Sequence, residues 1–229
     1  MKVACLLNGQ PRFTDYFFDF VSHKLPREIS VDWFIYLWNQ KSTDDSRIPT
    51  WWDENPHKII NILTDLSHSV IDFTVVDFPT YDTTFDTFQH KRPESMPRNI
   101  WYMFKSLYEA GKNLQASTEY DLVIKIRPDL TTDKLINYDT CLEFIKKNPN
   151  IIITSSYHTW GFNVKEINDW FAIGDHKCMS TYTKVFPNLK KYCQAGIIQH
   201  PESLLASHLI LNDIDWIYSN IINKLTGKN

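Results

Sequence analysis

The sequence predicts a single α/β domain built on a mostly parallel, twisted sheet that is flanked by helices. Across the first 130 residues, short apolar runs rich in β-branched side chains alternate with amphipathic segments, which is the pattern of parallel strands joined by crossover helices. The chain has 229 residues and is 43% hydrophobic, enough for one sizeable core. No internal repeat divides it. We therefore expect residues 1–229 to form one domain, with 1–130 and 131–229 as its two halves.

The expected elements follow from hydrophobic periodicity and from turn residues. Strands are expected at 2–7, 32–37, 70–76, 122–127, 150–154 and 167–174, and helices at 13–24, 56–67, 97–115, 138–147, 175–185 and 201–211. The clearest helix, 97–115, has one apolar stripe, which includes Gly111, with residues spaced three and four apart. Tyr102 is expected on the opposite, polar face, and Ser95 is the expected N-cap. Segments 40–55 and 77–93 are expected to be long loops. In the first of these, we expect Trp51 and Trp52 to anchor the loop rather than to stack on a ligand.

Composition excludes several classes of function. The net charge is −3 and no block of like charges occurs, which argues against nucleic acid as a partner. No apolar run approaches the roughly 18 residues of a membrane span, and the N-terminus does not resemble a signal peptide. The four cysteines lack metal-ligand spacing, which favours a reduced setting without zinc or disulfides. We expect a cytoplasmic protein.

The stretch 120–130 is the centre of the functional interpretation. Its apolar run reads as a buried strand that ends at Arg127, because Pro128 cannot continue a central strand. Arg127 and Asp129 then stand at the carboxyl end of that strand, where open α/β sheets bind their ligands. A cation and an anion at such a place suit a phosphate-bearing or metal-bridged ligand. The alternative is that the two side chains only pair with each other or cap a helix.

Two further segments are candidates for binding an anion. The turn after the first strand has a flexible glycine and leads into a helix N-terminus, a common anion site, and Arg12 could contact a phosphate there. The first turn of the helix at 97–115 has free N–H groups and a favourable dipole. The candidate binding residues in these two segments are Asn8, Gly9, Gln10, Arg12, Arg98 and Asn99.

The helix at 201–211 is apolar nearly all round, so it should be buried. Glu202 lies on the same line as Leu205 and Leu209 and should face inward. Since acidic side chains are seldom buried unpaired, its partner is of interest. Stabilisation of its own helix dipole is the alternative role.

Five segments, taken in order, resemble a small family of GT-A-fold glycosyltransferases. They are LNGQPRF (7–13), DWFIYLW (32–38), YDLVIKIRPDL (120–130), DWFAIG (169–174) and PE (201–202). We associate that family with bacterial surface-polysaccharide loci and with large DNA viruses of algae that glycosylate their own capsids. In such enzymes the strand that corresponds to 122–127 of this chain ends in an acidic DxD motif. Here Arg127 replaces the first acid, which leaves one carboxylate for a metal.

The resemblance implies a sugar transfer from a nucleotide-sugar donor, most simply a UDP-sugar, to a glycan or glycoprotein acceptor. Residues 1–130 would bind the donor and 131–229 would face the acceptor. Asp129 would bind Mn²⁺ or Mg²⁺, and Arg127 and Arg12 would stabilise the diphosphate. Asp169 or Glu202 would be the general base if the reaction inverts. The alternative role of Asp169 is to cap the N-terminus of a strand.

Two other functions remain open from the sequence. A sugar nucleotidyltransferase shares the broad architecture, but it usually has a long Gly-rich loop after its first strand, and Gly9 alone falls short of that. A non-catalytic carbohydrate- or nucleotide-binding module would suit the aromatic loops. Modules of that kind are commonly all-β, which the alternation of strands and helices contradicts.

Overall fold

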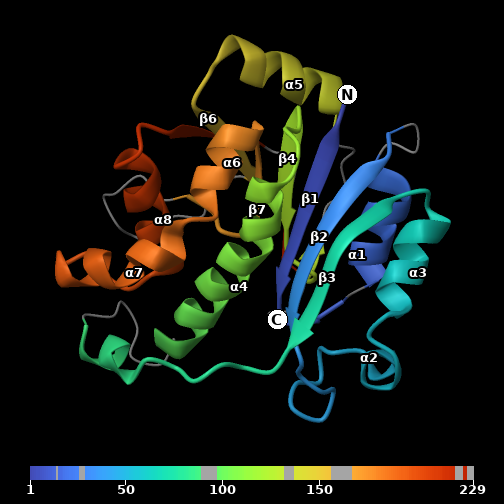
Figure 1. Ribbon diagram of the computed structural model, residues 1–229, viewed down its shortest axis with the longest axis horizontal. Helices are drawn as coiled ribbons and strands as arrows, with labels where there is room; N and C mark the ends of the chain where they lie inside the picture. The colour runs from blue at the N-terminus through green and yellow to red at the C-terminus, as the bar shows by residue number, and fades with distance from the viewer. Residues whose placement is uncertain are drawn as a thin grey trace.

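The computed structural model describes residues 1–13, 15–25, 29–88, 97–131, 137–155, 167–219 and 224–225. They form a single α/β domain in which a seven-stranded mixed sheet, of order β3-β2-β1-β4-β7-β6-β8, is covered by helices (Figure 1). The predicted fold class is therefore confirmed. The expected N-cap Ser95 lies outside the described residues.

The strands of the main sheet are β1 (Val3–Gly9), β2 (Val31–Trp38), β3 (Ser69–Val76), β4 (Leu122–Ile126), β6 (Ile151–Ser155), β7 (Phe171–Gly174) and β8 (Asp215–Ser219). Two short strands, β5 (Leu130–Thr131) and β9 (Lys224–Leu225), pair separately. The α-helices are α1 (Asp15–Asp19), α2 (Thr50–Glu54), α3 (Lys58–Asp65), α4 (Pro97–Ala116), α5 (Tyr138–Lys147), α6 (His176–Tyr182), α7 (Val185–Gln194) and α8 (Pro201–Ile210). A π-helical turn, η1 (Phe20–Lys24), extends α1, and a 3₁₀ turn, η2 (Thr83–Thr87), follows β3.

Strand β4 lies in the middle of the sheet and marks a change in strand direction. Strands β3, β2, β1 and β4 are mutually parallel, whereas β7 runs antiparallel to both β4 and β6. Strand β8 is parallel to β6 and forms the outer edge. As a result, the carboxyl ends of β1, β2, β3 and β4 come together at one edge of the sheet, where a ligand site is expected.

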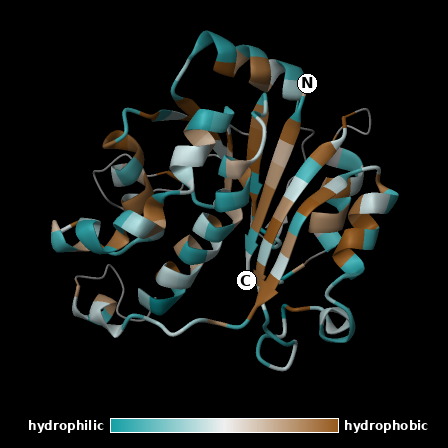
Figure 2. Ribbon diagram, viewed as in Figure 1, coloured by the Kyte–Doolittle hydropathy of each residue, from teal (hydrophilic) through white to brown (hydrophobic). Residues whose placement is uncertain are grey.

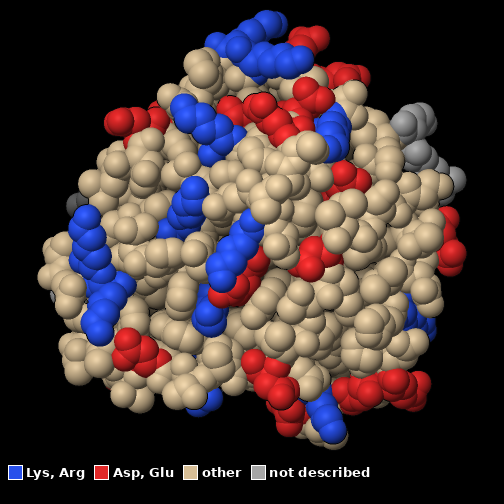
Figure 3. All heavy atoms as spheres, in the orientation of Figure 1, with Lys and Arg blue, Asp and Glu red and all other residues tan. Residues whose placement is uncertain are grey.

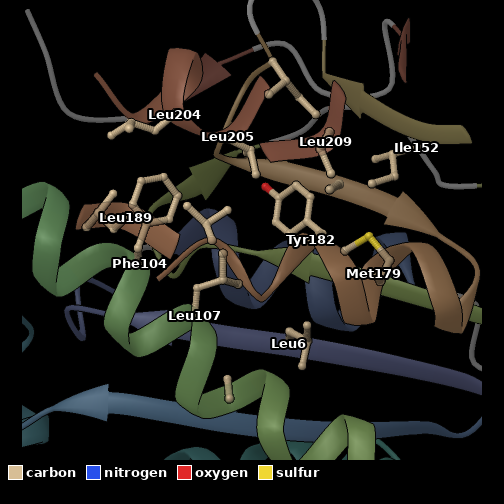
Figure 4. Packing of buried hydrophobic residues seen from close by; sticks show 14 of the residues in the cluster. Leu6, Phe104, Leu107, Ile152, Met179, Tyr182, Leu189, Leu204, Leu205 and Leu209 are labelled. Carbon is tan, nitrogen blue, oxygen red and sulfur yellow. The ribbon is translucent and has the colours of Figure 1, made fainter. Parts of the chain in front are cut away.

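Alternating side chains of the strands enter two separate cores. On one face, Leu6 of β1 packs with Phe104 and Leu107 of α4 and with side chains from α6, α7 and α8 (Figure 4). On the other face, side chains of α1, α3 and α5 cover Cys5 and Leu7. The strands are mostly hydrophobic because both faces of the sheet are buried, and the helices are banded with polar residues (Figure 2).

Helix α4 approaches the turn between α6 and α7 very closely at Gly111. A Cβ atom placed there would overlap the side chain of Thr183. Gly111 was predicted to be part of the apolar stripe, and its lack of a side chain is what lets the two elements meet. On the outer side of the same helix, Glu109 pairs with Lys105 and Lys112, and Figure 3 shows positive and negative groups adjoining at the place of α4.

Several predicted elements differ from those observed. The helix expected at 175–185 ends at Tyr182, and a second helix, α7, follows after a turn. The loop at 40–55 contains α2, in which Trp52 is only 1% exposed and packs on Phe13, so this tryptophan does anchor the loop. Strand β8 was not predicted. Tyr102, expected on the polar face of α4, is instead buried.

The strand expected at 167–174 begins only at Phe171. The hydroxyl of Thr154 donates to the carbonyls of Asn168 and Phe171, and the Asn168 side chain accepts from the N–H of Trp170. These bonds replace ladder hydrogen bonds over the first residues of the segment. They hold the backbone on either side of Asp169, so this residue has a defined position before the strand starts.

Candidate active site

A cleft of about 400 Å³ lies at the carboxyl ends of β1, β2 and β4 and the first turns of α4. Its walls are Asn8, Gly9, Gln10, Arg12, Trp38, Gln40, Phe78, Arg98, Asn99, Tyr102, Met103, Lys125, Arg127, Pro128 and Asp129. The structure thus brings all eight predicted binding residues together in one cleft. The two predicted catalytic residues, Asp169 and Glu202, do not line it.

The turn after β1 forms one wall of the cleft. Gly9 has φ +110°, in the region that favours glycine, and no atom would obstruct an added Cβ, so backbone conformation alone requires the glycine. The N–H of Arg12 bonds to the carbonyl of Gln10 at 2.8 Å, which tightens the turn. Asn8 is 4% exposed and donates to Ser106 of α4 at 3.0 Å, so the turn is tied to the helix whose N-terminus faces the cleft.

Arg12 is held in place from the loop between β2 and α2. Its Nε and Nη2 lie 2.8 and 2.7 Å from one oxygen of Asp45. The same carboxylate accepts from Nε of Arg47 at 2.9 Å and from Nη2 at 2.7 Å. Hydrogen bonds from Arg47, and then the charge of Arg12, hold the pKa of Asp45 far below its usual range. One carboxylate therefore orients two guanidinium groups, and the trio keeps a net positive charge beside the cleft.

Arg127 and Asp129 pair with each other directly after β4, as the simpler sequence interpretation allowed. Nε and Nη2 of Arg127 lie 2.9 and 2.8 Å from the two Asp129 oxygens. Nη1 of the same guanidinium lies 3.8 Å from Asp169. Burial alone would lower the pKa of Arg127, but the two carboxylates raise it above its ordinary value. The guanidinium is permanently charged and links the cleft to the acidic residue behind it.

Lys125 is a cleft residue that the sequence interpretation missed. It sits inside β4, beside Leu6 of β1 and Ala172 of β7, and is only 2% exposed. Its ammonium donates a hydrogen bond to the backbone carbonyl of Asp169. Burial lowers its pKa to about 8, although the charges of Asp169 and Asp129 act in the opposite direction. A lysine within a run of five buried strand residues was the signal that could have revealed it, since parallel central strands are otherwise almost wholly apolar.

Asp169 lies behind Arg127 and is 4% exposed. Burial, and then the negative charge of Glu202, raise its pKa, while Arg127 and Lys125 lower it less. Glu202 stands in the first turn of α8, with its side chain 13% exposed and Oε2 at 2.9 Å from Nδ1 of His200. The expected inward position of Glu202 is therefore observed, and the structure places two acidic side chains within electrostatic range of each other.

An aromatic wall closes the cleft on the side of β2 and β3. Trp38 at the end of β2 stacks on Phe78 with ring centroids 5.2 Å apart, and Phe78 lies 4.7 Å from Tyr102 of α4. The hydroxyl of Tyr102 donates to the carbonyl of Pro79, which ties the loop after β3 to the helix. Flat apolar faces next to cationic groups suit a ligand with a ring at one end and an anionic group at the other.

A divalent cation fits the described donor set poorly. No group of three or more His, Cys, Asp or Glu side chains that could hold a metal occurs among the residues that the structure describes. Both oxygens of Asp129 already accept hydrogen bonds from Arg127. Mg²⁺ and Mn²⁺ prefer free oxygen ligands, so Asp129 would have to leave Arg127 in order to bind one.

The fold has counterparts among solved structures. With its parallel half-sheet followed by an antiparallel strand, the chain is similar in fold to a glycosyltransferase. One such solved structure is the glycosyltransferase GlyE of Streptococcus pneumoniae TIGR4. Its apo form matches with a TM-score of 0.52 and 13% identity over 95% of this chain and 45% of that chain. A second GlyE structure gives 0.49 and 13% over 94% and 45%.

These likenesses concern the fold alone. The chain spans 45% of the length of GlyE, so the rest of that protein has no counterpart in the match. No protein-family model matches the sequence, and no curated protein does. Within the described part of the chain, no helix is long and apolar enough to cross a membrane.

Proposed function

We propose that this protein transfers a sugar, of hexose type, from a nucleotide-sugar donor to a glycan or glycoprotein acceptor, with a UDP-sugar as the donor. One observation carries the proposal: four cationic side chains, Arg12, Arg98, Lys125 and Arg127, line one cleft in a chain of net charge −3. A nucleoside diphosphate is a compact, multiply charged leaving group that needs such a site. The likeness of the fold to a glycosyltransferase supports the same interpretation.

In this proposal the guanidinium groups of the cleft stabilise the departing diphosphate. The acceptor oxygen attacks the anomeric carbon, and the bond from that carbon to the diphosphate oxygen breaks with its electron pair. Asp45 and Asp129 hold the guanidinium planes of Arg12 and Arg127 in position, and the remaining N–H donors of these planes meet the new negative charge. Because these donors are in place before the reaction, little reorganisation is needed in the transition state.

The acceptor's proton goes to Asp169 or Glu202 if the reaction inverts the anomeric centre. The raised pKa of Asp169 brings this carboxyl nearer to neutral pH, which favours a general base. Asp169 is the more enclosed of the two, because its side chain is 6% exposed and that of Glu202 is 13% exposed. If neither is the base, the leaving diphosphate takes the proton and the reaction retains configuration.

A requirement for Mn²⁺ or Mg²⁺ at Asp129 stays a prediction, and the cationic cleft offers a way to stabilise the diphosphate without it. Two further expectations also remain predictions: a cytoplasmic setting, and membership of the small family of bacterial polysaccharide loci and algal viruses. The cytoplasmic setting rests on the cysteine spacing and the lack of a signal-peptide pattern in the sequence. The family rests on the sequence resemblance, since the structural match extends only to the fold.

Titration calorimetry with UDP and GDP, each with and without Mn²⁺, tests the proposal. We expect heat with UDP, and transfer of label from a UDP-hexose to an oligosaccharide acceptor or to water. No heat with either nucleotide would overturn the proposal. Tight UDP binding without any turnover would favour a binding module, and release of pyrophosphate from UTP and a sugar 1-phosphate would favour a nucleotidyltransferase.

A further inference from the structure

Lys125 has more hydrogen-bonding capacity than the described part of the protein uses. An ammonium group has three N–H donors, and in the described residues one of them has a partner, the carbonyl of Asp169. The side chain is nevertheless 2% exposed and lines the cleft. Burying a charge is costly unless the group is fully hydrogen-bonded. A structural tie to one carbonyl does not account for that cost, because a neutral donor would serve as well.

The surroundings of Lys125 show where the missing partners belong. The charged groups that act on it are Asp169 and Asp129, which favour its charged form, and Arg127, which opposes it. Lys125 and Arg127 are two residues apart on β4 and its exit, and both line the cleft. An anionic oxygen between the two cations would turn their mutual repulsion into attraction for a shared ligand.

We propose that Lys125 is a direct ligand of the anion that binds in the cleft, and that Lys125 and Arg127 together seat one phosphate of a nucleoside diphosphate. The inference rests on the proposed function only for the identity of the ligand as a nucleotide. The seat itself is a phosphate site made of one compact ammonium and one planar guanidinium.

Two variants separate a ligand role from a structural one. Lys125→Met keeps the apolar stem and removes the charge. Lys125→Gln keeps an N–H donor for the Asp169 carbonyl and also removes the charge. Lys105→Met is the matched control, since Lys105 lies on α4, pairs with Glu109 and does not line the cleft.

Calorimetry with inorganic pyrophosphate, UDP and uridine is the experiment. We expect both Lys125 variants to lose about 10- to 100-fold in affinity for pyrophosphate and UDP, the usual effect of losing a hydrogen bond to a charged group. Uridine affinity should stay within about twofold, and Lys105→Met should match the wild type for all three ligands.

Two results would overturn the inference. One is wild-type pyrophosphate affinity in a folded Lys125 variant. The other is an equal loss for uridine and UDP, which would show that Lys125 only supports the fold of the cleft. If the wild type binds pyrophosphate but not UDP, the nucleotide-sugar proposal fails, while the phosphate seat is still tested by the pyrophosphate titrations.

Discussion

Arg127 holds Asp129 through two parallel hydrogen bonds, from Nε to Oδ1 at 2.9 Å and from Nη2 to Oδ2 at 2.8 Å. The pair spans Pro128, two residues beyond the end of β4, so it fixes the direction in which the chain leaves the sheet. Because both Asp129 oxygens are occupied, the group of this turn that is available to a ligand is the guanidinium of Arg127 and not the carboxylate. Whether Asp129 serves a metal or serves Arg127 can therefore be decided by experiment.

Asp129→Asn should distinguish these two roles. If Asp129 only orients Arg127, the variant loses UDP affinity by about tenfold, and the loss is the same with and without Mn²⁺, because one charge-assisted pair is weakened. If Asp129 binds the metal, any gain in affinity that Mn²⁺ gives the wild type disappears in the variant. Calorimetry in the two conditions measures both. Melting temperatures on the same samples show whether the fold is intact.

Asp169→Asn is expected to lower turnover by roughly 10²- to 10⁴-fold with little change in donor affinity, because it removes a general base but no donor contact. Glu202→Gln would have that effect instead if the roles are exchanged. The acidic limb of the pH–rate profile should vanish only in the variant that lacks the base. Glu143→Gln, an exposed site on α5, is the control. If both variants slow transfer by less than severalfold, the diphosphate itself takes the proton.

Lys125 should make the stability of the unliganded protein depend on pH in the alkaline range. Its pKa is about 8 in the folded chain and near 10.5 when unfolded, so between these values the unfolded chain binds more protons. The free energy of unfolding should therefore rise with pH from 8 to 10.5, by on the order of 3 kcal/mol relative to Lys125→Met. Urea unfolding of both proteins across this range measures it. Parallel curves would show that Lys125 does not titrate there.

Gly111→Ala should destabilise the protein by about 1–3 kcal/mol, because the new methyl group would overlap the Thr183 side chain. Replacement of a mid-helix glycine by alanine would otherwise stabilise a helix by about 1 kcal/mol. Urea unfolding checks the sign. The double variant Gly111→Ala/Thr183→Gly should lose less stability than the sum of the losses in the two single variants. An additive result would contradict the overlap as the cause.

The parallel half of the sheet was predictable because β1, β2 and β4 are largely buried on both faces and so appear as mostly apolar runs. Strand β8 could not be predicted, because it is a short edge strand and most of its side chains are only half-buried. The start of β7 was also misplaced, because side-chain bonds from Thr154, on another strand, replace the ladder there.

The cleft residues were predictable for a topological reason: the ends of parallel strands meet at one edge, wherever they fall in the sequence. Contacts between side chains that lie far apart in the sequence could not be predicted. Asp45 reaches Arg12 across 33 residues, from a loop whose conformation no local pattern specifies. Lys125 was overlooked because it was read as one position in an apolar strand, and only its burial beside the cleft shows what sets it apart.

Strand β8 bears on how the chain is made in the cell. It is the outermost strand next to β6 and the last of the seven to leave a ribosome, some 60 residues after its partner (Figure 1). Until then β6 would carry an unpaired edge, which is a risk for association between nascent chains. Trp216, 2% exposed in the finished sheet, becomes buried at that final step. Chains truncated before Asp215 should therefore aggregate during synthesis, even though every residue of the cleft is already present.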